Sequence, residues 1–214
     1  MKNKEFYLFY IMKITGCIIT LLIFNFLFMI ILNIIFERLF TLLGILPFMN
    51  TFTYIFSLII FFIIVPGVYL HMKKDFNLEG IKLKWNTSRY SLIIKFIALS
   101  LYLLIFIRLI LVSDVTDAIN SILLFSFIGI SEEILIRGYI YYELRKNCST
   151  LWTVIISSLI FAFFMHTAGG SMPNLVIRFP ISLVLTYAAI FTKDIYTSIL
   201  LHSAYDMAII SLAI

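Results

Sequence analysis

The sequence predicts an all-α polytopic membrane protein of about seven transmembrane helices, with a polar site buried in the bundle. Of its 214 residues, 63% are hydrophobic and 13% are charged, whereas a soluble domain carries about 25% charged residues. The mean hydropathy is +1.10. Long apolar runs separated by short polar segments fill the chain, so we expect residues 1–214 to form a single membrane domain without a sizeable soluble part.

Three apolar runs in the first half are long enough to cross a bilayer. Ile14–Phe36 is longer than the apolar core of a signal peptide and lacks a small-residue cleavage site, so we expect a retained helix. Phe48–Leu70 is the second predicted span and Tyr90–Val112 is the third. Lys95 and Arg108 lie near the two ends of the third span, from which their long side chains can snorkel to the membrane surface.

Polar segments connect these spans. Glu37–Pro47 is predicted to be a turn, and His71–Arg89 is the longest polar stretch. In that stretch basic residues alternate with aromatic and aliphatic ones, which is typical of a loop anchored at the membrane interface. The alternative is a docking surface for lipid or substrate.

Four further spans are predicted in the second half. They are Ile119–Leu144, Leu151–His166, Leu175–Thr192 and Ile195–Ile214. The fourth is unusual because it carries ionisable residues within an otherwise apolar run, and such residues in a membrane indicate function.

Loop charges predict a cytoplasmic N-terminus in a multi-pass cell-membrane protein, because basic residues concentrate in cytoplasmic loops. With this orientation the outer segments hold only one basic residue, Arg38. The net charge of +5 therefore reflects the orientation of the loops in the membrane and does not indicate nucleic-acid binding. Cys17 and Cys148 fall near the cytoplasmic side and are expected to be reduced thiols. The inner segments hold Lys2, Lys4, Lys13, Lys73, Lys74, Lys82, Lys84, Arg89, Arg145, Lys146 and Lys193.

The stretch Ser131–Gly138 reads S-E-E-I-L-I-R-G and is the main candidate for a functional site. On a helix Glu133 and Arg137 are i and i+4 neighbours, so they can form an ion pair. Glu132 points about 100° away from Glu133, which leaves it free for chemistry. Taken alone, this octet could instead contain a buried ion pair whose only role is to hold two helices together.

Three more polar groups lie within the later spans. His166 ends the fifth span, and His202 and Asp206 share one face of the seventh at i and i+4. A rise of about 1.5 Å per residue places all three near the depth of Glu132. A single histidine in a transmembrane helix is usually a hydrogen-bond partner of another helix. Four polar groups at one depth instead predict a common site.

These motifs, in this order, resemble the CPBP family of type II CAAX prenyl proteases and bacteriocin-processing enzymes, also called the Abi family. The resemblance covers about residues 121–214 and includes Glu132–Gly138, Ser157–His166 and Ser198–Asp206. The family usually has F-x-x-x-H in the second motif, but Ala162 stands four residues before His166. Asp206 stands where asparagine is also common in the family.

The resemblance implies an intramembrane endopeptidase that cleaves a membrane-associated peptide or protein. The chain has neither a Ser-His-Asp set nor an H-E-x-x-H motif, so water activated by Glu132 is the available route to peptide hydrolysis. Glu132, helped by His166, is the candidate base that activates water, and His202 and Asp206 are candidates for holding the oxyanion or the substrate backbone. Glu133 and Arg137 would support the site. The preferred mechanism needs no cofactor.

Three alternatives stay open. Glu132, His166 and His202 form a two-histidine, one-carboxylate set that suits a divalent metal such as zinc. The chain could instead be a non-catalytic membrane binding protein, for example a bacteriocin self-immunity factor. A small proton-coupled transporter is the third alternative, although the sequence has no detectable repeat of the kind that many transporters share.

Overall fold

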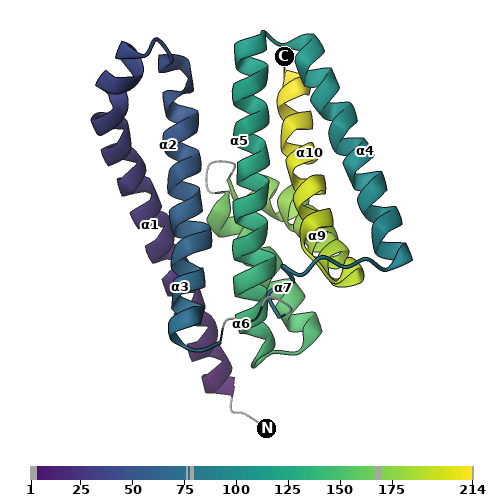
Figure 1. The fold of residues 1–214 in the computed structure, drawn as a ribbon. Helices are drawn as coiled ribbons and strands as arrows, with labels where there is room; N and C mark the ends of the chain where they lie inside the picture. The colour runs from purple at the N-terminus through teal and green to yellow at the C-terminus, as the bar shows by residue number, and fades with distance from the viewer. Residues whose placement is uncertain (1–3, 76, 78–79, 167–169, 214) are drawn as a thin grey trace.

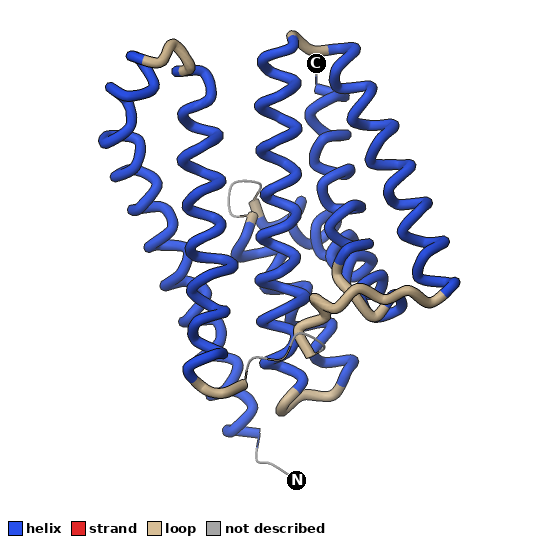
Figure 2. The backbone as a smooth tube through the Cα atoms, in the orientation of Figure 1, coloured by secondary structure: helices blue, strands red, loops and turns tan. Residues whose placement is uncertain are grey.

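The protein is a bundle of helices, seen in the computed structural model (Figures 1 and 2). The structure describes residues 4–75, 77, 80–166 and 170–213, and no strand occurs among them. Lys2 of the basic head, Phe76 and Leu78 of the long polar stretch, and Ile214 lie outside the described residues. Within the described part the all-α class predicted from composition is confirmed.

The first unit is a long helical hairpin, drawn at the left of Figure 1. Helix α1 (Lys4–Leu42) runs antiparallel to α2 (Met49–Leu58), which continues through the π-helical turn η2 (Ile59–Ile64) into α3 (Val65–Met72). The prediction of a turn from Glu37 was wrong, because α1 continues to Leu42. Only a short connection and the 3-10 turn η1 (Leu46–Phe48) separate the two arms.

The second unit contains α4 (Arg89–Val112), α5 (Val115–Glu133) and α10 (Tyr196–Ala213), which stand side by side in Figure 1. Helix α10 packs against α4, α5 and α9. Helix α5 continues through the π-helical turn η3 (Ile134–Ile140) into α6 (Tyr141–Arg145). Behind them lie α7 (Thr150–Ile160), η4 (Phe161–Met165), α8 (Ser171–Pro173), η6 (Asn174–Arg178) and α9 (Phe179–Thr192).

Five helical stretches among the described residues are long and apolar enough to cross a membrane. They correspond to the first, second, third, fourth and sixth predicted spans. The fifth is the shorter apolar stretch Thr150–Met165, and the seventh is α10. A multi-pass membrane protein is therefore confirmed, and the count of seven spans stays a prediction. The five stretches are Leu8–Leu42, Leu46–Met72, Arg89–Val112, Val115–Arg145 and Ser171–Thr192.

A glycine allows α5 and α10 to approach closely. A Cβ added to Gly129 would overlap with Oγ of Ser203 and lie 3.2 Å from the Ser203 backbone nitrogen. Small residues at helix contacts in membranes permit this kind of backbone approach. Gly129 lies less than one turn before Glu132, and Ser203 follows His202, so this contact sets the distance between the two main polar segments.

The connection between α3 and α4 is fixed to the turn between α9 and α10. Lys95 forms a buried ion pair with Asp194, and its Nζ donates to the Asn86 carbonyl at 2.7 Å. The Asn86 amide nitrogen donates in turn to Asp194 Oδ2 at 3.0 Å. Only 4% of Lys95 is exposed, so these partners rather than water hold its charge, and its reach to the membrane surface stays a prediction.

Candidate active site

Glu132 and Glu133 lie at the end of α5, where the α-helix changes into the π-helical turn η3. The sequence predicted one continuous α-helix through this point. π-helical turns are rare and occur frequently at functional sites. Both carboxylates are buried, with 4% of Glu132 and none of Glu133 exposed.

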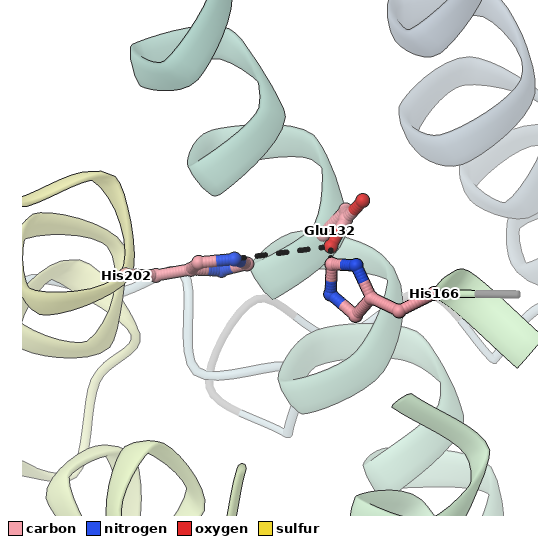
Figure 3. Close-up of side chains that lie close together, drawn as sticks. All are labelled: Glu132, His166 and His202. Carbon is pink, nitrogen blue, oxygen red and sulfur yellow. Dashed lines mark ion pairs between the residues drawn. The ribbon is translucent and has the colours of Figure 1, made fainter. Parts of the chain in front are cut away.

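Glu132 lies between two imidazole rings that come from distant parts of the chain (Figure 3). Its Oε2 atom is 3.7 Å from Nε2 of His166 and 3.9 Å from Nε2 of His202. The same Oε2 atom is buried and accepts no hydrogen bond from the described residues. The structure therefore brings together these three of the four residues that the sequence placed at one depth.

His202 is held by carboxylates on both of its ring nitrogens. Nδ1 lies 2.9 Å from Glu133 Oε1, and Nε2 lies 3.4 Å from Asp206 Oδ2. An imidazole that carries a proton on each nitrogen satisfies both carboxylates at once. This geometry suits His202 to donating hydrogen bonds, and it includes Asp206 in the cluster as the sequence predicted.

The Glu133–Arg137 pair is present, but it is not separate from the site. Arg137 Nη1 donates to Glu133 Oε1 at 2.8 Å, and that oxygen also faces His202. Arg137 Nη2 donates to Ser182 Oγ at 2.7 Å, and Nε donates to Thr186 Oγ1 at 3.3 Å. The pair therefore belongs to the cluster, because Glu133 connects Arg137 to His202. Ser182 and Thr186, at i and i+4 on α9, were not predicted as partners.

In the second motif Ala162 stands where the family usually has phenylalanine, and Phe161, one residue earlier, takes the place of that ring. Phe161 places its ring 4.8 Å from that of His166 and 5.2 Å from that of His202, measured between ring centroids. It precedes His166 by five residues rather than four, and η4 between them is π-helical. A π-turn places residues i and i+5 on one face, as an α-helix does for i and i+4. Ala162 is fully buried instead.

A cavity of about 280 Å³ opens beside this cluster. Glu132, His166, His202 and Asp206 all line it. Tyr54 of α2, Arg178 of η6 and Tyr205 of α10 line it as well, although no periodicity or spacing in the sequence predicted them. The apolar part of the wall consists of Phe125, Ile128, Phe161, Met165, Ile181, Ile209 and Ile210.

The cluster also has the composition of a metal site. One ligand atom each from Glu132, His166 and His202 lies within 4.8 Å of the others. Two imidazoles and a carboxylate are suitable ligands for zinc and for other divalent ions. The unpartnered Glu132 Oε2 fits this chemistry, whereas the two carboxylates on His202 favour a protonated ring, which binds no metal.

Fold and site together define a polytopic, all-α membrane protein with a carboxylate–imidazole cluster in its interior. Residues 114–208 match a family described as type II CAAX prenyl endopeptidase, Rce1-like. This segment includes all four predicted site residues, and the match confirms the resemblance to the CPBP family. No curated protein and no solved structure matches the chain. The family implies a CAAX-type intramembrane protease with endopeptidase activity in general, acting on a protein or peptide.

Proposed function

We propose that this protein is an intramembrane endopeptidase that hydrolyses a membrane-associated peptide or protein with water activated by Glu132. One observation carries the proposal. The buried Oε2 atom of Glu132 has no hydrogen-bond partner among the described residues, and it lies 3.7 and 3.9 Å from two imidazole nitrogens beside a cavity. A carboxylate in this setting is suited to act as a general base.

The first step is attack of water on the scissile carbonyl carbon. The attacking water would bind in the cavity beside Glu132 Oε2 and His166 Nε2, which are 3.7 Å apart and both face it. Glu132 takes one proton from the water as the oxygen–carbon bond forms. When the carbon–nitrogen bond breaks, Glu132 returns that proton to the leaving amine, so the products are a new carboxyl end and a new amino end.

The negative charge that develops on the carbonyl oxygen needs a donor that is already in place. His202 supplies it from Nε2, while Glu133 holds Nδ1 on the other side of the ring at 2.9 Å. Asp206 Oδ2 lies 3.4 Å from the same Nε2 atom and accepts its proton until the oxyanion forms and takes that place. Arg137 keeps Glu133 charged and oriented, and so supports the site without touching the substrate.

A divalent metal is the alternative route to the same reaction. Glu132, His166 and His202 would hold it, and a bound metal ion polarises a carbonyl and makes water more acidic. Inhibition of purified enzyme by a chelator, with recovery on adding zinc, would favour this route. Activity that persists after exhaustive chelation would favour the metal-free route.

The test compares peptides released from membranes that contain the wild type or Glu132→Gln, identified by mass spectrometry. Glu37→Gln is the matched control, because Glu37 is an exposed glutamate in the last turns of α1. We expect Glu132→Gln to reduce release by about 10²- to 10⁴-fold, the usual contribution of a general base. Glu37→Gln should release peptides as the wild type does.

A wild-type peptide pattern from Glu132→Gln, at equal protein level, would contradict the proposal. Such a result would favour a non-catalytic binding protein, since binding does not require a base. Protection against a peptide toxin that survives the Glu132→Gln change would point to the same alternative.

A further inference from the structure

A second cavity of about 540 Å³ lies between α1, α3 and the η3–α6 segment. It shares no lining residue with the cavity beside Glu132. Along α1 it extends from Tyr10 to Leu21, which is about 16 Å at the helical rise. That length is close to one leaflet of a bilayer whose hydrocarbon core is about 30 Å thick.

The wall of this groove is mostly apolar, and three of its hydroxyl groups already donate hydrogen bonds. Tyr10 donates its hydroxyl to the Glu143 carbonyl at 2.6 Å, and Tyr139 donates to the Ile63 carbonyl at 3.2 Å. Thr20 donates to the carbonyl of Gly16 on its own helix. These hydroxyl protons are therefore not available to the carbonyls of a peptide backbone, whereas a hydrocarbon chain needs no hydrogen-bond partner.

Two cations lie on the same groove. Lys13 and Lys73 are exposed lining residues, and neither forms an ion pair with any described residue. Lys73 lies over the ring of Tyr69 at 4.3 Å. The acid that lines the groove, Glu143, is already paired with Lys146 at 2.7 Å. The unpaired charge at this groove is therefore positive.

The combination of an apolar groove and unpaired lysines points to one ligand class. We propose that this groove binds an anionic phospholipid, with an acyl chain along α1 and the phosphate near Lys13 and Lys73. The headgroup then lies at the end of the bundle that carries the basic connections. This site is independent of peptide hydrolysis.

Native mass spectrometry of the purified protein tests this with phosphatidylglycerol and phosphatidylcholine of identical acyl chains. We expect phosphatidylglycerol to bind more tightly. Lys13→Ala and Lys73→Ala should each weaken it about five-fold, and the double change roughly thirty-fold, as expected for lysines at an anionic lipid surface. Arg89→Ala is the matched control, because Arg89 is an exposed cation outside the groove.

Gly16→Leu tests the acyl-chain part separately. A Cβ at Gly16 meets nothing within 4 Å, so the new side chain fits on the helix and fills the groove. Leucine also favours the helix over glycine, so the variant should fold. We expect it to reduce binding of both lipids. Unchanged phosphatidylglycerol binding in Gly16→Leu, or equal binding in the wild type and the double lysine variant, would overturn the proposal.

Discussion

Glu132 and Glu133 are adjacent and both buried near His202, yet their hydrogen-bond partners differ. Glu133 shares one oxygen between Arg137 and His202, whereas Glu132 Oε2 has no hydrogen-bond partner among the described residues. The i, i+4 spacing was sufficient to predict which glutamate pairs with Arg137. It could not predict the contact with His202, because that depends on how α10 packs against α5.

This difference predicts different consequences of the same substitution. Glu133→Ala leaves Arg137 buried with Ser182 and Thr186 but without its carboxylate, and breaking a buried pair costs about 3–5 kcal/mol. We expect lower protein levels and a lower melting temperature than for the wild type. Glu132→Ala removes no hydrogen bond to a described residue, so it should preserve protein levels while abolishing cleavage.

The measurement is the level and thermal stability of each variant after purification in the same detergent. Glu133→Gln should be intermediate, since its amide oxygen can still accept from Arg137. Equal loss of protein from Glu132→Ala and Glu133→Ala would contradict this division between a structural and a chemical carboxylate.

At the scale of helices, the apolar runs in the sequence were enough to predict where most of the helices begin and end. The predicted third span Tyr90–Val112 and the observed α4 (Arg89–Val112) agree to one residue. The π-helical turns could not be predicted in this way, since they depend on tertiary packing rather than on local composition. The π-helical turn η4 adds one residue between Phe161 and His166, so the ring of Phe161 lies where the motif predicts the side chain of residue 162.

The contact between Gly129 and Ser203 gives a prediction for the helix pair α5–α10. Gly129→Val places a Cβ with two methyl groups against Ser203, which the Cβ alone would already overlap, and overpacking of this kind costs about 1–3 kcal/mol. Because the same contact sets the spacing of Glu132 and His202, we expect activity to fall more than stability. Thermal unfolding and peptide release, measured together, test this.

Gly16→Ala is the control for this change. Its Cβ meets nothing within 4 Å, and alanine favours a helix over glycine by about 1 kcal/mol. We expect stability equal to or above that of the wild type. Wild-type activity in Gly129→Val would show that the approach of α5 and α10 does not determine the geometry of the site.

At the scale of the whole molecule, the positions of the two ends of the described chain indicate which connections lie on the same side of the membrane. The start of α1 and the end of α10 lie at opposite ends of the bundle in Figure 1. The long connection after α3 and the turns before α7 and α10 lie toward the end where the chain starts (Figure 2). These are the basic connections counted in the sequence, so charge asymmetry and fold agree on which segments share a side.

This arrangement predicts an external C-terminus. If the basic connections are cytoplasmic, as basic loops usually are, then α10 ends on the outer side. An alkaline phosphatase fused after Ile214 should therefore be active, and a green fluorescent protein fused there should not fluoresce. Fusions after Lys74, in the basic connection that follows α3, should give the reverse pattern. Fluorescence from the fusion at Ile214 would mean that α10 or Thr150–Met165 does not cross the membrane, because either change alters the number of crossings by one.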